Sequence, residues 1–251
     1  VHTPYLGMEH QTINAYGNNY KKTKRGYDFI LFHEAGHEWW GNYISVADWS
    51  DFWIHEGICT YAESMYIEEK FGLESAKNFI DERFKKNITN TAPIVPERNS
   101  NANLESGNDV YYKGAHALHM LRYIIGKETL WASLKEYLQM PKELPDNQTS
   151  TDEFISLIEE NSGMKLDWFF NQYFFKKELP TLRKLEKTIK NKKYVDLWWE
   201  EVDFKMPVEI NYFSFDGKRY KKLDLDNKPK RFVIPSDSKL IIDPNRWLLY
   251  K

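Results

Sequence analysis

The sequence predicts an α+β protein in which a mainly helical domain is followed by a small all-β sandwich. Before Leu179, apolar residues recur at the spacing of amphipathic helices in one segment after another. From Leu182 onward, the sequence changes to short alternating stretches separated by turn residues, which is typical of a β-sandwich. We therefore place a domain boundary near Leu179, with predicted domains over residues 1–178 and 179–251.

The composition excludes several classes of protein. A formal net charge of −2 over 251 residues gives no basis for a nucleic-acid or membrane-surface partner. No run of about eighteen apolar residues is present, so we expect no membrane span in this chain. The single cysteine, Cys59, excludes an internal disulfide, and we expect it to be a buried thiol. The chain begins with VHTPYLGMEH, without an initiator methionine or a signal peptide, and resembles the interior of a longer protein.

The first residues are predicted to contribute one strand and a loop. Residues 12–17 suit a strand end or the edge of a sheet, and residues 18–25 are polar and basic, as expected for a loop. Glu9 precedes this strand and, taken alone, is an ordinary surface acid. Its interpretation depends on two motifs further along the chain.

The helical elements follow in order up to the domain boundary. Apolar periodicity predicts helices over residues 28–40, 50–71, 74–86, 115–125, 127–140, 150–162 and 166–176. Ser50 is the expected N-cap of the second helix, and Ser150 with Glu153 forms an expected capping box. Residues 87–108 are rich in Asn, Thr, Pro and Ser without periodicity, so they are predicted to be a long loop, which in a compact domain is often functional.

The β domain is predicted from six short stretches. These cover residues 182–189, 194–199, 207–215, 220–225, 231–234 and 239–243. Asp216–Gly217 is a strong hairpin signal between two of them.

One motif in the helical domain points to a metal. His33, Glu34 and His37 form the pattern H-E-x-x-H. On a helix, residues i and i+4 lie on one face about 6 Å apart along the axis, so two imidazoles can converge on one ion. Glu34 is rotated by roughly 100° from His33, which is too far for ligation but close enough to act on a water. A chance match in a chain of this composition is expected about one time in a hundred.

A catalytic zinc usually has three protein ligands and one open position. Glu56, after eighteen intervening residues, is the candidate for the third ligand, because it lies on the next predicted helix. Three other histidines are expected not to bind metal. His55 points to a different helix face from Glu56, and His116 and His119 have no acidic neighbour in sequence, so we expect packed or surface side chains.

These motifs together resemble the aminopeptidase N family of zinc peptidases, the gluzincins. The resemblance rests on Gly7-Met8-Glu9, on H-E-x-x-H with Glu56, and on Tyr111 before Lys113-Gly114. It covers nearly the whole chain and implies a thermolysin-like catalytic domain followed by an Ig-like β-sandwich. The sequence departs from the family pattern at three positions, where it has Leu6, His10 and His55. The two histidines are expected to affect substrate preference near the amine end.

The resemblance implies roles for particular residues. His33, His37 and Glu56 would bind one Zn²⁺ per chain, and Glu34 would take a proton from a zinc-bound water as that water attacks the peptide carbonyl. Tyr111 would stabilise the negative oxygen that forms, with Tyr112 as the fallback for this role. Glu9, on a substrate-binding strand with Gly7 and Met8, would hold the α-ammonium of a peptide with a free N-terminus. Asp51 and Asn42 would support the ligands, although a helix cap is an equal alternative for Asp51.

The family also implies a β-rich domain before the catalytic one, so the chain is expected to be an N-terminally truncated piece with poor turnover. The function implied is zinc-dependent hydrolysis of N-terminal peptide bonds. The alternatives are another zinc hydrolase on the same scaffold, such as an endopeptidase or an epoxide hydrolase, and a metal-containing module without catalysis. Intact Glu34 argues against the last of these.

Overall fold

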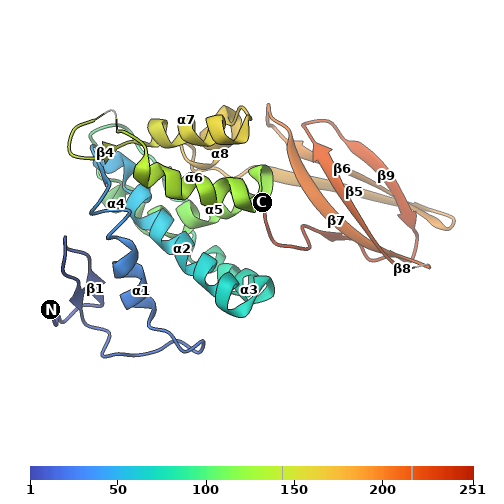
Figure 1. Ribbon diagram of the computed structural model, residues 1–251. Helices are drawn as coiled ribbons and strands as arrows, with labels where there is room; N and C mark the ends of the chain where they lie inside the picture. The colour runs from blue at the N-terminus through green and yellow to red at the C-terminus, as the bar shows by residue number, and fades with distance from the viewer. Residues whose placement is uncertain (143, 216) are drawn as a thin grey trace. The chain divides into compact units, whose positions relative to one another are not determined.

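The computed structural model describes residues 1–142, 144–215 and 217–251. The described residues divide into two compact units, Val1–Lys177 and Glu178–Lys251, and each is considered by itself (Figure 1). The first unit is mainly helical and the second is all β, so the predicted α+β class is confirmed.

Helices form most of the first unit. They are α1 (Phe29–Gly36), α2 (Trp53–Phe71), α3 (Leu73–Arg83), α4 (Ala102–Glu105), α5 (Tyr112–Ile125), α6 (Lys127–Gln139), α7 (Thr151–Ser162) and α8 (Asp167–Tyr173). Single 3₁₀ turns cover Trp49–Asp51, Lys85–Asn87 and Gly107–Val110. Two short strand pairs complete the unit: β1 (Gly7–Met8) is antiparallel to β2 (Ala15–Tyr16), and β3 (Ser45–Val46) is parallel to β4 (Gln148–Thr149).

The core of the first unit is built around α2. Its first residue, Trp53, is fully buried, with its ring 4.7 Å from that of Phe174 and 5.2 Å from that of Phe154. α2 and α5 approach closely because both carry glycine at the crossing. A Cβ on Gly57 would lie 3.3 Å from the Cα of Gly114 and 3.0 Å from a backbone oxygen. This close crossing places the start of α5 beside the first turns of α2, which carry the predicted ligand Glu56.

The first predicted helix is shorter than expected. Asp28 caps α1 by accepting a hydrogen bond from the backbone of Leu31, but the helix ends at Gly36 rather than at residue 40. The next residues form tight turns in which the amide of Asn42 donates to the carbonyl of His37 at 2.8 Å. Gly41 has φ of +139°, a conformation that breaks the helix and favours glycine.

The predicted cap of the second helix is wrong. Ser50 caps neither element: the carboxylate of Asp48 caps the 3₁₀ turn Trp49–Asp51 by accepting from the amide of Ser50 at 2.9 Å, and α2 itself starts after Phe52 without a side-chain cap. A 3₁₀ turn therefore precedes α2, which begins at Trp53. At α7 the predicted cap is correct, because Ser150 Oγ accepts from the amide of Glu153 at 3.3 Å.

The predicted loop over residues 87–108 contains more structure than its composition indicates. It includes the one-turn helix α4, which Asn101 caps, and the start of a 3₁₀ turn. Its first part is held by the buried carboxylate of Asp109, which accepts from the amides of Thr89 and Asn90 at 2.7 and 2.6 Å. A helix of one turn is too short to produce a readable apolar period, so the sequence did not reveal it.

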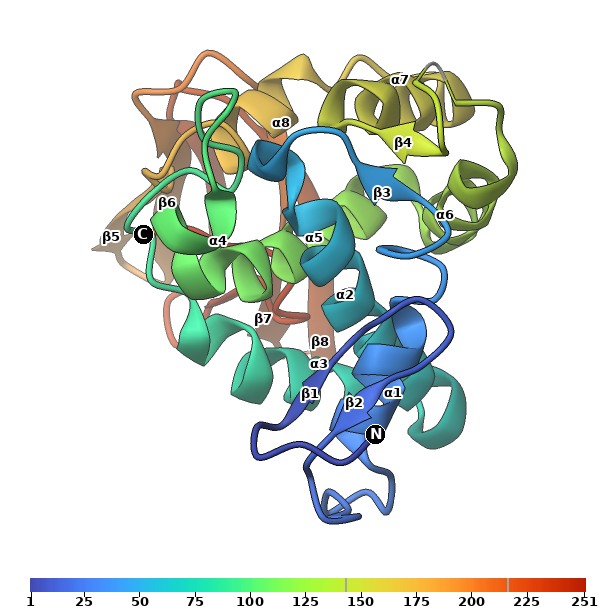
Figure 2. The ribbon, with the colours of Figure 1, turned by 90° about the vertical axis from the view of Figure 1, so that its left-hand side faces the viewer.

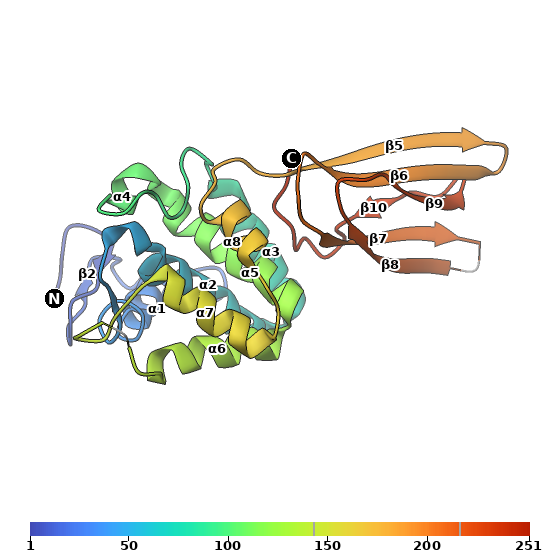
Figure 3. The ribbon, with the colours of Figure 1, turned by 90° about the horizontal axis from the view of Figure 1, so that it is seen from above.

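The second unit consists of two three-stranded antiparallel sheets, which are stacked in Figure 3. One sheet has the order β5-β6-β9 and the other has the order β10-β7-β8. The strands are β5 (Thr181–Ile189), β6 (Lys192–Glu200), β7 (Met206–Ser214), β8 (Gly217–Leu225), β9 (Lys230–Pro235) and β10 (Ile241–Ile242). Of the predicted hairpin turn, Asp216 lies outside the described residues, while Ser214 pairs with Gly217.

The buried faces of the two sheets form the core of this unit. Val195, Leu197 and Trp199 alternate along β6 and are fully buried, as a strand with one covered face requires. The indole of Trp199 donates to the carbonyl of Met206 at 3.1 Å, which links β6 to the other sheet. Within the described residues of the whole chain, no helix has both the length and the apolar character needed to cross a membrane.

Candidate active site

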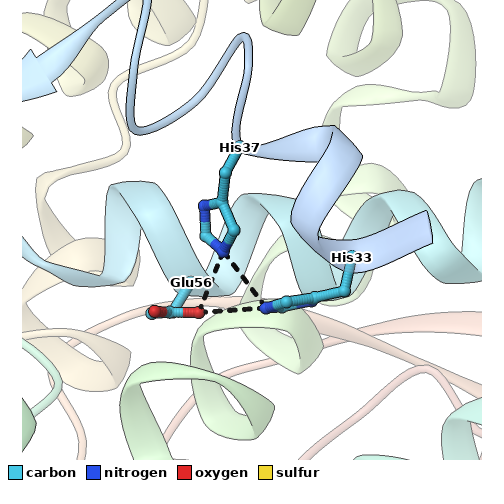
Figure 4. A group of neighbouring side chains, drawn as sticks. All are labelled: His33, His37 and Glu56. Carbon is cyan, nitrogen blue, oxygen red and sulfur yellow. Dashed lines mark hydrogen bonds and ion pairs between the residues drawn. The ribbon is translucent and has the colours of Figure 1, made fainter. Parts of the chain in front are cut away.

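His33, His37 and Glu56 meet at one point, as Figure 4 shows. His33 lies on the last turn of α1, His37 is the residue that ends this helix, and Glu56 lies on the first turn of α2. His33 Nε2 is 3.2 Å from His37 Nε2 and 3.1 Å from Glu56 Oε2, and His37 Nε2 is 3.4 Å from Glu56 Oε2.

These three distances fit a zinc ion. Ligands at about 2.0–2.1 Å in a tetrahedron are separated from one another by roughly 3.3 Å. The two nitrogens and the oxygen therefore form a triangle of the size of one tetrahedral face. Two imidazoles and a carboxylate are also a donor set that zinc accepts in catalytic sites.

The other ring nitrogen of each histidine is also held. His33 Nδ1 lies 3.3 Å from Glu63 Oε1, and His37 Nδ1 lies 3.0 Å from the carbonyl oxygen of Trp40. Such contacts fix the tautomer and turn Nε2 toward the metal position. Glu63 was not singled out in the sequence. A signal existed, because it follows Glu56 by seven residues and so lies on the same face of α2.

The charges of the site suit a cation. Burial raises the pKa of Glu56, but hydrogen bonds to His33 and His37 outweigh this effect and lower that pKa to about 2, so the carboxylate is ionised. Burial lowers the pKa of His33, whereas the hydrogen bonds to Glu56 and Glu63 raise it to about 10. The surroundings that stabilise a proton on this ring also stabilise a metal dication, which competes with the proton for the same nitrogen.

Glu34 differs from the ligand carboxylate. It is 5% exposed, and burial raises its pKa to about 7 even though the neighbouring His33 and His37 act in the opposite direction. One oxygen of Glu34, one of Glu9 and a nitrogen of His37 all lie within 4.8 Å of one another. A carboxyl group with a pKa near neutrality is suited to accept and return a proton.

The strand β1 lies against α1, as Figure 2 shows. A Cβ on Gly7 would lie 2.5 Å from Glu34 Oε1 and 2.7 Å from a methyl carbon of Ile30, so only glycine fits here without a shift. Glu9, two residues further along, has an oxygen 4.0 Å from His37 Nδ1. The predicted substrate-binding segment therefore borders both the metal position and Glu34.

Tyr111 reaches the site from the turn before α5. Its ring is stacked on that of His33, with centroids 6.2 Å apart and 28° between the planes. Burial and the carboxylate of Glu56 raise the pKa of Tyr111, so its hydroxyl stays protonated and can donate a hydrogen bond. Tyr112 is its neighbour at 6.2 Å between ring centroids and also borders the site.

A single cavity of about 340 Å³ collects these groups. Its lining includes all the residues named as site residues from the sequence: Gly7, Met8, Glu9, His33, Glu34, His37, Glu56 and Tyr111. Tyr112, the fallback for Tyr111, also lines it. The other lining residues were not named as site residues from the sequence: Leu6, Phe29, Ile30, Thr60, Glu63 and Arg83.

The remaining candidates lie elsewhere. His55 is turned toward β3, where its Nε2 accepts from the amide of Val46 at 3.1 Å, and burial lowers its pKa to about 4. It does not line the cavity, so its expected effect on substrate preference has no structural basis. His116 and His119 are buried in α5, in agreement with a packing role. Asp51 does not cap a helix but pairs with Arg98.

Comparison with known proteins identifies a family. The model of the peptidase family M1 domain matches residues 8–173. Aminopeptidase M1 of Arabidopsis thaliana is 25% identical over 164 residues, which are 61% of this chain and 18% of that protein. Endoplasmic reticulum aminopeptidase 2 of Bos taurus is 30% identical over 118 residues, 44% of this chain and 12% of that protein. The chain thus spans less than a fifth of these relatives.

Two solved structures share the fold. Aminopeptidase A of Legionella pneumophila, in complex with aspartic acid, has a TM-score of 0.74 at 18% identity and covers 95% of this chain and 29% of its own. An M1 zinc metallopeptidase of Deinococcus radiodurans, in a mutant bound to a Tyr-Ser-Ala substrate, has a TM-score of 0.59 at 21% identity. That match covers 71% of this chain and 38% of the other.

Proposed function

The chain belongs to peptidase family M1, and from this premise we propose that it carries the active site of a zinc-dependent aminopeptidase. The substrates are peptides with a free N-terminus, and the bond cleaved is the first peptide bond. One observation carries the proposal: Glu9, Glu34 and the three candidate metal ligands line the same cavity. The peptide bound to the Deinococcus relative supports the substrate class.

Zinc, held by His33, His37 and Glu56, would supply a Lewis acid that lowers the pKa of a water toward about 7 and polarises the scissile carbonyl. Glu34 accepts the proton of the attacking water and passes it to the leaving amine, a role that its position in the cavity beside the candidate ligands permits. Tyr111 donates a hydrogen bond from its protonated hydroxyl to the oxygen on which negative charge develops.

Glu9 is the residue that would make the enzyme an aminopeptidase rather than an endopeptidase. Its carboxylate lies beside His37, at the edge of the metal position, where it can pair with the α-ammonium of the substrate. The ammonium is one residue away from the scissile bond, so fixing it there selects the first peptide bond. An endopeptidase would need room for further residues at this place.

The test is hydrolysis of leucine p-nitroanilide by the zinc-loaded chain, compared with its N-acetyl derivative. We expect cleavage of the free amine alone, and a loss of about 10²–10⁴-fold in rate for Glu34→Gln with zinc content unchanged. Equal cleavage of the acetylated compound would identify a different hydrolase. An unchanged rate in Glu34→Gln would contradict the proposed role of this residue.

A further inference from the structure

We propose that Arg83 binds a carboxylate on the leaving-group side of the substrate, so that the site favours short peptides with a negative charge in their second or third residue. This inference rests on the proposed function and adds a specificity determinant to it. Arg83 is the last residue of α3, an element that supplies none of the residues assigned to the metal or to the proton transfer.

The guanidinium of Arg83 lies over two aromatic rings at the cavity. Its central carbon lies 4.6 Å from the ring centre of Phe29, on α1, and 5.5 Å from that of Tyr112, on α5. All three side chains line the cavity. Within the part of the chain that the structure describes, no carboxylate lies within ion-pair distance of this guanidinium.

Arg83 is a positive charge in a cavity whose other charged lining residues are mostly acidic. The lining of the cavity includes four carboxylates, those of Glu9, Glu34, Glu56 and Glu63, and Arg83 is the only lysine or arginine among the described lining residues. A guanidinium against aromatic rings keeps its planar fork of N–H donors in one orientation. That fork matches the two oxygens of a carboxylate better than any other group of a peptide.

The position of Arg83 relative to α1 indicates which part of the substrate it faces. Glu9 lies beside His37, just past the C-terminal end of α1, whereas Arg83 lies over Phe29, the first residue of this helix. His33 and Glu34 lie between the two ends. A peptide with its ammonium at Glu9 and its scissile carbonyl near His33 therefore directs its leaving group toward Arg83.

The length of this path corresponds to a short peptide. From residue 29 to residue 37 a helix rises by about 12 Å, at 1.5 Å per residue. An extended tripeptide spans roughly 10 Å, at 3.3–3.6 Å per residue. The C-terminal carboxylate of a tripeptide, or an acidic side chain of its second or third residue, falls within reach of Arg83.

The test measures peptide binding to the zinc-loaded Glu34→Gln chain by calorimetry, so that it does not depend on turnover. The probes are Leu-Ala-Ala, its C-terminal amide, and the amide of Leu-Asp-Ala. We expect the free acid to bind about 10-fold or more tightly than its amide, because a charge-assisted hydrogen bond is lost in the amide. The Leu-Asp-Ala amide has an acidic side chain but no terminal carboxylate. If it binds more tightly than the Leu-Ala-Ala amide, an acidic side chain can supply the carboxylate; if it does not, the chain terminus supplies it.

Arg83→Met in the same background should reduce the ratio of acid to amide affinity to within about twofold, and Arg83→Lys should keep part of it. Equal binding of acid and amide, or an equal loss of both in Arg83→Met, would overturn the inference. If Arg83→Met does not fold, the ratio of acid to amide affinity in the parent chain tests the inference by itself. Hydrolysis of leucine p-nitroanilide by the chain with Glu34 intact reports separately on the proposed function.

Discussion

The orientation of the His33 ring depends on the carboxylate of Glu63, which contacts its Nδ1. Glu63 is 1% exposed, and its contact with Nδ1 of His33 is the one that turns Nε2 toward Glu56 and His37. Removing the negative charge of Glu63 weakens the contact with Nδ1 and makes the His33 ring less basic. Glu63 therefore supports the candidate metal site although it is not one of the three proposed ligands.

We expect Glu63→Gln to weaken zinc affinity by about 10–100-fold, because contacts behind a ligand typically contribute this much. Competition with a chelator of known affinity measures the effect. Glu69→Gln is the matched control, since it removes the same charge from the same helix at a side chain that is 62% exposed. Equal zinc affinity in the two variants would show that Glu63 does not support His33.

Gly7 is a second residue whose effect is indirect. A methyl group at this position would collide with Glu34 and Ile30, so Gly7→Ala must displace β1 or Glu34. Misplacing a reacting group by about 1 Å can cost roughly 100-fold in rate. We expect Gly7→Ala to lower kcat by about 10–100-fold while the chain still binds one zinc. A normal kcat would show that the contact between β1 and Glu34 is not needed.

The sequence could predict that His33, His37 and Glu56 meet because the spacing of the histidines is set by local geometry. His33 and His37 share a helix face, and Glu56 follows on the next helix. Glu63 shares a helix face with Glu56, but local spacing could place neither Glu63 nor Arg83 at the cavity. Their relation to the cavity depends on how α2 and α3 pack against α1, and no local period encodes that.

At the scale of elements, a buried carboxylate joins three segments that are distant in sequence. Asp51, in the turn before α2, is fully buried and accepts from Thr151 Oγ1 at 2.6 Å, at the start of α7. It also forms an ion pair with Arg98, from the segment that was predicted to be a loop. Trp53 donates to the same threonine hydroxyl at 2.8 Å. This junction anchors the first turn of α2, and with it Glu56.

We expect Asp51→Ala to lower the free energy of unfolding by about 1–3 kcal/mol, because it leaves buried hydrogen-bonding groups without a partner. Asp152→Ala is the matched control. Asp152 pairs with the same guanidinium but is 75% exposed, and loss of such a surface pair costs at most about 1 kcal/mol. Urea denaturation of both variants measures the difference. Equal losses would contradict a special role for Asp51.

Element boundaries were harder to predict than element types. The predicted helix over residues 28–40 ends early because the turns after His37 and the backbone conformation of Gly41 stop it. These are local backbone features that the apolar period does not encode. Asp48 and Ser50 are both good caps by residue type, so the sequence alone did not distinguish them. The structure shows that Asp48 caps the 3₁₀ turn before α2, and that α2 itself has no side-chain cap.

At the scale of the whole molecule, the α+β class followed from a change of apolar period that is visible in the sequence. The helical part shows a period near 3.6, whereas β6 buries every second residue from Val195 to Trp199. The cavity uses only residues of the first unit, Val1–Lys177, which is also where the family match lies. The predictions of a truncated catalytic domain and of an Ig-like sandwich stay predictions.

We expect the purified chain to bind one zinc through His33, His37 and Glu56. The most direct measurement is metal content by elemental analysis after dialysis against zinc-free buffer, together with the melting temperature with and without added zinc. We predict one zinc per chain, a higher melting temperature in zinc because the ion binds only the folded state, and no zinc in the double variant His33→Ala, His37→Ala. A parent chain without zinc, or a double variant that keeps zinc, would contradict zinc binding by these three residues.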